Sequence, residues 1–177
     1  MNDQDYEIRI AFNGLREYIS QYDGEFVEDF KNGLNALESA NYGTAKTIFE
    51  KIANHGNPVA QCHLGSLYSM GRGVPQDYEQ AIYWYEKSAN QGYAIAQSHL
   101  GFMYQEGQGV PQDAKKAVEL YEKSANQGVA IGQYNLGISY FYGEGVPQDD
   151  ETAFYWLEKA ANQAHLSIYH LSIISEL

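Results

Sequence analysis

Residues 57–92 read NPVAQCHLGSLYSMGRGVPQDYEQAIYWYEKSANQG, and this stretch decides the fold. Much of it returns after 36 residues and then returns once more, so that three glycines share one position: Gly65, Gly101 and Gly137. Alanine recurs with the same period at Ala81, Ala117 and Ala153. Self-similarity with a period of about 20–50 residues is typical of stacked helical repeats, in which no single unit can bury its apolar face alone.

The first half of each repeat is predicted to be a helix with one apolar stripe. Ala60, Leu64 and Leu67 follow one another at spacings of four and three, which places them on one side of a helix. A glycine inside a helix costs about 1 kcal/mol relative to alanine, so three glycines at one position need a steric reason. We predict that the missing side chain at Gly65 lets a second helix approach, and that the recurring alanines are small for the same purpose.

The segment GRGVPQD at 71–77 is predicted to be a loop, and it recurs as GQGVPQD and GEGVPQD. Its first glycine, Gly71, suits the left-handed residue that follows a helix end, and Pro75 stops the helix from continuing. Asp77 is a good N-cap for the next helix, and Gln80 is placed to complete a capping box. The repeat therefore predicts helix, loop, helix.

This pattern, AxxxLGxxYxxGxGVPQDxxxAxxWYxKxAxxG, resembles the Sel-one-like repeat (SLR) family, which is related to the tetratricopeptide repeats (TPR). The resemblance covers Phe30 to about Ser172. It implies an all-α fold, a right-handed α-solenoid of stacked antiparallel helix pairs. It also implies a protein that acts as an adaptor or inhibitor within complexes, without catalytic residues of its own. We expect no cofactor and no metal.

The two ends of the chain depart from the full repeat. Ile8, Phe12, Leu15 and Ile19 share one helix face, which predicts a helix that covers the first end of the stack. The next unit lacks the glycine-proline loop and should have the tighter turn of a TPR. The predicted order within one domain is an N-terminal capping helix (1–24), a short TPR-like repeat (25–56), three full repeats (57–92, 93–128 and 129–164) and a C-terminal capping helix (165–177).

Composition limits the possible partners. The formal net charge of −12 argues against nucleic acid and anionic membranes and suits a basic protein partner, although such a charge also promotes solubility. The acidic first residues do not resemble a secretory signal, and Cys62 is the only cysteine. We therefore expect a cytoplasmic protein. We also expect a monomer or a weak homodimer through the apolar C-terminal helix, with Leu166, Ile174 and Leu177 as contacts.

The residues that change between repeats are the candidates for binding. They lie on the side of the first helix away from the recurring positions, and in TPR-type stacks this side lines the concave groove that receives partners. The alternative is that these surface positions have drifted without a role in binding. However, the variable positions of the third full repeat are all apolar or aromatic, which favours contact with a partner. The predicted binding residues are Ile95, Ser98, Phe102, Gln105, Glu106, Ile131, Tyr134, Ile138, Phe141 and Tyr142.

Signals for catalysis are weak. His63 and His99 share a repeat position, but first helices stacked about 10 Å apart are too distant for shared metal ligation, so packing is the better interpretation. The leading hypothesis is a non-enzymatic scaffold that holds a partner polypeptide in its groove. The first alternative is an immunity or inhibitor protein that neutralises a basic toxin or effector. A hydrolase using Cys62 and His63 is the less favoured alternative, because it needs a reactive thiol in a pocket.

Overall fold

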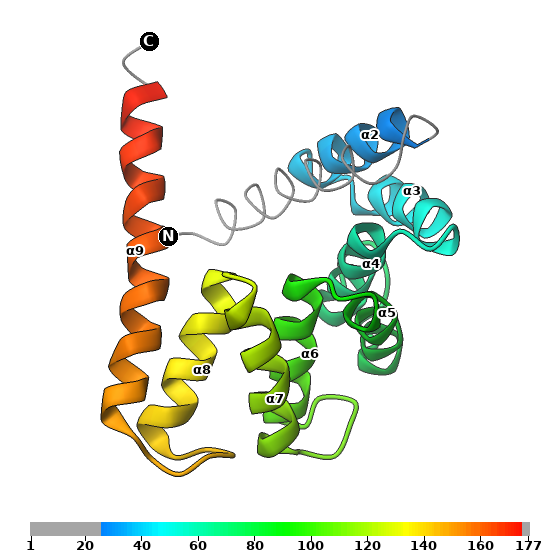
Figure 1. Ribbon diagram of the computed structural model, residues 1–177. Coiled ribbons are helices and arrows are strands. Elements are labelled where there is room, and N and C mark those ends of the chain that lie inside the picture. The colour runs from blue at the N-terminus through cyan, green and yellow to red at the C-terminus, as the bar shows by residue number, and fades with distance from the viewer. Residues whose placement is uncertain (1–25, 175–177) are drawn as a thin grey trace. The chain divides into compact units, whose positions relative to one another are not determined.

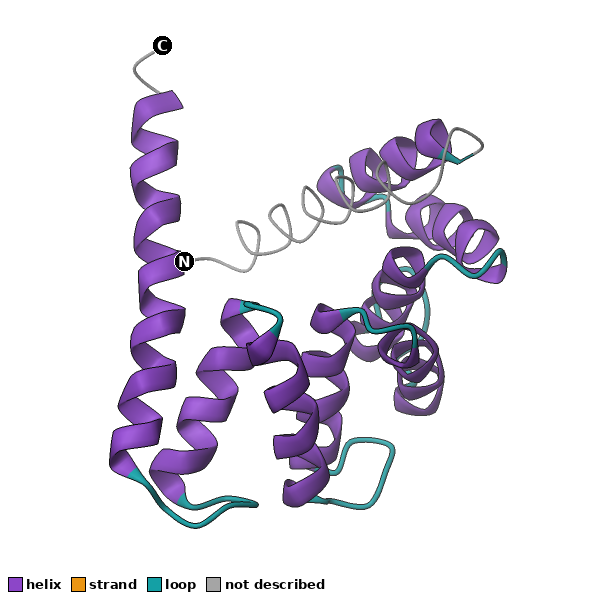
Figure 2. Ribbon diagram, in the orientation of Figure 1, coloured by secondary structure: helices purple, strands orange, loops and turns teal. Residues whose placement is uncertain are grey.

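The computed structural model describes residues 26–174, and every regular element in that range is an α-helix (Figure 2). The chain divides into two compact units, Met1–Gln91 and Gly92–Leu177. The first contains α2 (Val27–Glu38), α3 (Tyr42–Asn54), α4 (Pro58–Met70) and α5 (Tyr78–Asn90) (Figure 1). The second contains α6 (Ala94–Glu106), α7 (Ala114–Asn126), α8 (Ala130–Tyr142) and α9 (Asp150–Ile174). The all-α prediction is confirmed, and the capping helix expected over 1–24 lies outside the described residues.

In the first unit, each helix packs on the next one along the chain. Phe30 of α2 meets Phe49 of α3 edge to face, with ring centroids 5.6 Å apart, and both side chains are fully buried. Only Ser39, Ala40 and Asn41 separate α2 from α3, so this pair has the tight connection expected of a repeat without the glycine-proline loop. The Asn41 side chain accepts a hydrogen bond from the Thr44 N–H and caps α3.

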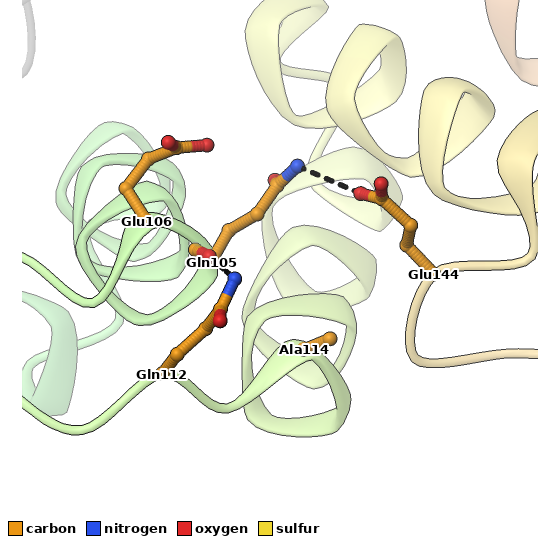
Figure 3. Close-up of a pocket in the computed structure, with 5 residues that line it drawn as sticks. All are labelled: Gln105, Glu106, Gln112, Ala114 and Glu144. Atoms are coloured by element: carbon orange, nitrogen blue, oxygen red, sulfur yellow. Dashed lines mark hydrogen bonds between the residues drawn. The ribbon is translucent and has the colours of Figure 1, made fainter.

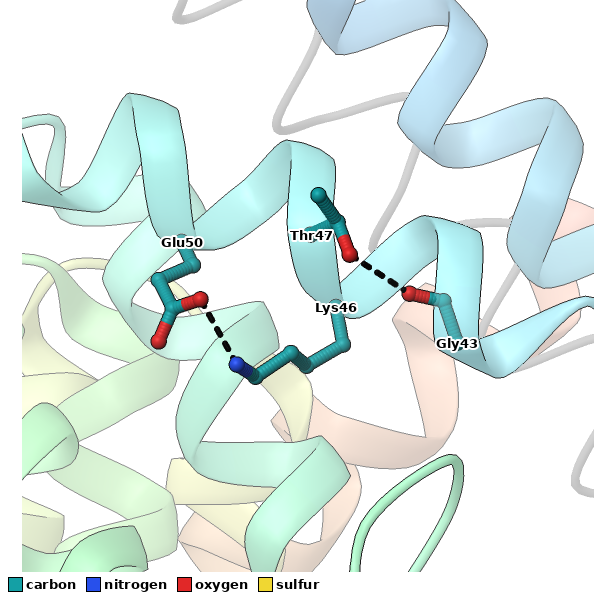
Figure 4. A network of polar contacts seen from close by, with 4 residues as sticks. All are labelled: Gly43, Lys46, Thr47 and Glu50. Carbon is teal, nitrogen blue, oxygen red and sulfur yellow. Dashed lines mark hydrogen bonds and ion pairs between the residues drawn. The ribbon is translucent and has the colours of Figure 1, made fainter.

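The outer side of α3 carries a short polar network (Figure 4). Lys46 Nζ lies 2.6 Å from Glu50 Oε2 one helical turn away, and this hydrogen bond raises the pKa of Lys46. The Thr47 hydroxyl donates to the Gly43 carbonyl oxygen at 3.0 Å. Pairs of this spacing contribute about 0.3–0.5 kcal/mol each on a helix surface, so the network supports α3 locally and adds little to the fold as a whole.

The recurring helix glycines lie where two helices of a repeat meet. A Cβ atom built on Gly65 would be 2.7 Å from the Tyr85 ring, and one on Gly101 would be 2.7 Å from the Tyr121 ring. Real Cβ atoms do not approach other atoms this closely, so the predicted close approach of the second helix is confirmed. The atoms in contact are mainly those of a buried tyrosine, whereas the recurring alanine contributes its backbone carbonyl.

The loops follow the predicted chemistry with one exception. Gly71 ends α4 in the left-handed conformation at φ 65°, and the Asp77 side chain accepts a hydrogen bond from the Gln80 N–H at 3.0 Å. The exception is the capping box, in which the Gln80 side chain would accept a hydrogen bond from the backbone N–H of Asp77. That N–H donates to the Tyr68 carbonyl oxygen instead. The loop thus closes back on the end of α4. Asp149 caps α9 in the same way, and its hydrogen bonds with Thr152 lower its pKa.

The same loops also join successive repeats inside each unit. A Cβ atom on Gly73 would be 2.5 Å from the backbone of Tyr42, at the start of α3. One on Gly145 would collide with the carbonyl group of Ala114, at the start of α7. The second glycine of the loop therefore lets the loop backbone lie directly on the first turn of the preceding second helix.

The C-terminal end differs from the expected arrangement. The spacing of the repeat predicts a helix that ends near residue 164 and a separate helix over 165–177, whereas α9 runs from Asp150 to Ile174 without interruption (Figure 1). Earlier repeats end at Gly92 and Gly128, with φ of 89° and 84°. The equivalent residue here is Ala164, which favours continuation of the helix over a left-handed turn.

Candidate functional site

Exposed aromatic side chains gather on the first helices of the second unit. Phe102 on α6 is 45% exposed, and on the neighbouring helix α8 Phe141 and Tyr142 are 38% and 65% exposed. The Phe141 and Tyr142 rings meet edge to face at 5.0 Å. We call the following group the α6/α8 stripe, since its members occupy three equivalent positions on the two helices: Phe102, Gln105 and Glu106 with Ile138, Phe141 and Tyr142.

Two of the predicted binding residues belong to the interior instead. Ser98 is 1% exposed and its hydroxyl donates to the Ser124 hydroxyl of α7 at 2.7 Å, while Ile95 is 8% exposed. Their equivalents in the preceding repeat, Val59 and Cys62, are also buried. The expectation that these two positions face a partner is therefore wrong. They vary because different small or branched side chains can fill the same packed space.

On α8 the same two positions are less covered. Ile131 is half-buried and Tyr134 is 53% exposed. Within the described residues, α8 is the first helix of the last repeat, because α9 continues where the turn to a further repeat would come. The exposure of Tyr134 thus reflects the end of the stack, and we separate it from the α6/α8 stripe.

A polar cavity of about 480 Å³ opens at the C-terminal ends of α6 and α8. Its lining residues are Gln105, Glu106, Gln112, Ala114 and Glu144 (Figure 3). Gln105 lies between the two carboxylates in Figure 3 and donates from Nε2 to Glu144 Oε2 at 3.2 Å. Gln112 donates to the Gln105 carbonyl oxygen at 2.7 Å. The cavity is thus built from three chain segments that hydrogen bonds hold together.

The cavity is electronegative. Tyr121 donates its hydroxyl to Gln105 Oε1 at 2.7 Å, which fixes the orientation of the amide. Burial, together with the nearby charges of Glu106 and Glu144, raises the pKa of Tyr121 above its ordinary range. Glu106 and Glu144 are the charged side chains among the residues that line the cavity, and they favour a cationic ligand over an anionic one.

The residues considered for catalysis are held in the core. Cys62 is 3% exposed, and burial raises the pKa of its thiol far above the ordinary range, which leaves it a poor nucleophile. The His63 ring stacks on Phe49, with centroids 4.7 Å apart and planes 22° apart, as a packing side chain does. Burial lowers the pKa of His99 to about 4. The burial of Cys62 and the ring stacking of His63 support packing roles for these two residues.

Among residues 26–174, no three histidine, cysteine or carboxylate side chains lie close enough together to hold a metal ion. None of the helices described there is long and apolar enough to cross a membrane.

Comparison with known proteins identifies the repeat. The family model described as Sel1 repeat matches residues 58–93, 94–129 and 130–165, which is more than half of the chain. The chain belongs to the Sel1 repeat family. Sel1 repeat proteins typically serve as protein–protein interaction scaffolds, so the family also supports a scaffold role in outline. Among curated proteins, no relative matches the chain.

Solved structures with this fold include two that are more than a third identical to the chain over the parts that align. The protective antigen c5321 of uropathogenic Escherichia coli, which displays an SLR fold, is 37% identical with a TM-score of 0.73, over 84% of this chain and 33% of that one. A Sel1 repeat protein from Oxalobacter formigenes is 34% identical with a TM-score of 0.69, over 74% of this chain and 52% of that one. The cysteine-rich protein B of Helicobacter pylori shares the fold, with a TM-score of 0.53. It is 24% identical over 68% of this chain and 91% of that one. This Sel1 repeat chain thus spans a third to a half of the first two relatives, and with them it is an α-solenoid.

One recurring feature of the Sel1 repeats escaped the sequence analysis. Three pairs of glutamines, 30 residues apart in each case, are hydrogen-bonded through their side chains. The first member lies on the first helix of a repeat, and the second lies on the second helix or directly after it. The pairs are Gln61 with Gln91 at 2.7 Å, Gln97 with Gln127 at 2.9 Å and Gln133 with Gln163 at 2.8 Å. The first member of each pair is buried. Gln61 also donates to the Ala53 carbonyl oxygen of the preceding repeat, and Gln133 does so to Ala125. Recurrence of glutamine at both positions was the available signal.

Proposed function

We propose that this Sel1 repeat protein is a non-enzymatic scaffold that binds a partner polypeptide along the α6/α8 stripe. The observation that carries the proposal is the exposure of Phe102, Phe141 and Tyr142 on two neighbouring first helices, next to an electronegative cavity. Exposed aromatic groups beside polar residues are typical of protein-binding surfaces, where a few such anchors supply most of the affinity.

The role of an immunity or inhibitor protein is a second candidate, and the charge favours it. A net charge of −12 and the carboxylates of the cavity suit a basic target, such as a toxin or effector. The buried, unpaired thiol of Cys62 suits a reducing compartment, so the proposed setting is the cytoplasm. We also propose a weak homodimer through the C-terminal helix. The side chains expected to form its contacts are not among those that the structure describes.

Peptide selection tests the binding surface. Random twelve-residue peptides displayed on phage are selected on the full chain, and the affinities of the selected peptides are measured by fluorescence anisotropy. Phe102→Ala combined with Phe141→Ala should weaken binding at least about ten-fold, since a single aromatic anchor often contributes about 2 kcal/mol. The melting temperature should change little, because both side chains are already partly exposed.

Phe154→Ala on α9 is the matched control, because Phe154 is 64% exposed and lies outside the stripe. It should leave binding unchanged. A selection that yields no peptide dependent on Phe102 and Phe141, or one whose peptides depend equally on Phe154, refutes the proposal.

A further inference from the structure

The first unit contains an arginine at the place that the cavity occupies in the second. Arg72, in the loop after α4, lies over the Tyr42 ring at the start of α3, with its guanidinium carbon 5.3 Å from the ring centroid. Two repeats later, the equivalents of Arg72 and Tyr42 are Glu144 and Ala114. The backbones correspond, because Gly73 lies on Tyr42 as Gly145 lies on Ala114.

The cavity follows from these two substitutions. Alanine at 114 removes the ring on which a guanidinium lies in the first unit, and glutamate at 144 reverses the charge of the loop residue. A third position does not change, because the first-unit counterpart of Glu106 is Glu38, each lying five residues after the recurring helix glycine. The second unit therefore keeps the backbone of the arginine site and has a second carboxylate, Glu144, in place of the arginine.

The charges of these carboxylates are not compensated inside the described part of the chain. Neither Glu106 nor Glu144 forms an ion pair among residues 26–174. Gln105 occupies one oxygen of Glu144 and leaves its other oxygen able to accept a hydrogen bond. The cavity borders the C-terminal ends of α6 and α8 and also the N-terminal end of α7 at Ala114, whose partial positive charge opposes theirs. The preference for a cation therefore comes from the two carboxylates.

We propose that this cavity binds one arginine side chain of the partner beside Glu106, Gln105 and Glu144, while neighbouring apolar residues of the partner pack on Phe141 and Tyr142. Arginine fits better than lysine because its planar fork can donate to two carboxylates at once. A cavity of about 480 Å³ has room for one such side chain together with water. The inference rests on the proposed function, since it names the chemistry of the residue that the scaffold recognises.

The test uses capped amino acids as probes. The full chain, labelled with ¹⁵N, is titrated with Nα-acetyl-arginine amide and followed by NMR. The side-chain amide signals of Gln105 and Gln112 should shift and saturate with a Kd of about 1–10 mM, a range expected for one weakly buried group. Gln76, the first-unit equivalent of Gln112, is the internal control and should not shift. Nα-acetyl-citrulline amide, which has the same shape without the charge, should bind at least about five-fold more weakly.

Two sets of variants complete the test. Glu106→Gln with Glu144→Gln alters only exposed side chains and should weaken arginine binding at least about five-fold. Ala114→Tyr with Glu144→Arg rebuilds the pair that already exists in the first unit, so it should fold normally and lose arginine binding. No saturable shift in the wild type, equal affinity for citrulline, or unchanged binding in the glutamine variant would overturn the proposal.

The selected peptides separate this inference from the proposed function. Peptides that need Phe102 and Phe141 but bind the glutamine variant at full affinity refute the arginine site and leave the scaffold intact. Peptides that depend on neither the aromatic pair nor the carboxylates refute both. If arginine is enriched among the peptides selected on the wild-type chain and not among those selected on the glutamine variant, the scaffold function and the arginine site are both supported.

Discussion

Replacing Gly101 by alanine should destabilise the second unit. The new Cβ atom would lie 2.7 Å and 2.9 Å from two ring carbons of Tyr121 and 3.2 Å from the Ala117 carbonyl oxygen. The ring has little freedom to move away, because Tyr121 is fully buried and its hydroxyl is bonded to Gln105. The gain from replacing a helical glycine by alanine is about 1 kcal/mol, and overpacking costs about 1–3 kcal/mol. We therefore expect a net loss of about 1 kcal/mol for alanine and a larger one for leucine.

Urea unfolding followed by far-UV circular dichroism measures this loss, with an unchanged m-value as the sign that the same structure unfolds. Gly137→Ala is the comparison, because Gly137 occupies the same position in the next repeat. Its nearest neighbour is Leu157, a half-buried side chain that can change rotamer, so its cost should be smaller. A Gly101→Ala protein as stable as the wild type, or more stable, would refute the close helix contact as the reason for the glycine.

A loop glycine separates steric contact from backbone strain. Gly107 has a φ of 65°, so alanine there should cost about 1–2 kcal/mol through strain. Asparagine tolerates this left-handed conformation, so Gly107→Asn should be less costly than Gly107→Ala. At Gly101 the order should reverse, since a larger side chain meets the same Tyr121 ring. The same order at both positions would contradict the two mechanisms.

The remaining predictions concern His99, which is half-buried, and the buried Cys62. The pKa of His99 is lowered to about 4, so below pH 6.5 the unfolded chain takes up a proton that the folded chain does not, and stability should fall by about 2 kcal/mol between pH 7 and pH 5. His99→Gln should remove that part of the pH dependence in urea unfolding, and an unchanged slope would show that the imidazole is not the cause. Cys62 should react with a thiol-specific disulfide reagent only after the chain is unfolded, and a fast reaction of the native thiol would revive the hydrolase hypothesis.

The helix pairs could be predicted from the sequence because their signals are local. Gly71 and Asp77 mark the end of one helix and the start of the next through the backbone conformation and the cap that each provides. The contact of Gly65 with its partner helix was also predictable, because a costly residue recurred at one position. Periodicity, capping and recurrence all act within a single repeat, and a stacked array adds few contacts that contradict them.

The binding surface was only partly predictable. Sequence variation marked Ile95 and Ser98 as exposed, but variation shows which positions tolerate change, and a packed position can tolerate a change of small side chains. The cavity was missed because it joins Gln105, Gln112 and Glu144 from three segments, which meet only after the loop lies on α7. Comparison of Glu144 with Arg72 across the repeats would have indicated it. The length of α9 depends on a single alanine in place of glycine, a weak signal in one sequence.

The glutamine pairs have a consequence for how such chains can change in evolution. Each pair joins positions 30 residues apart, and the link from Gln61 to Ala53 recurs between Gln133 and Ala125. An in-frame duplication or deletion of 36 residues would therefore deliver each glutamine donor together with its acceptor and leave none of these paired amides without its partner. Copy number can then drift while these hydrogen-bonded pairs stay complete. Relatives such as c5321, of which this chain spans 33%, are compatible with growth by such steps.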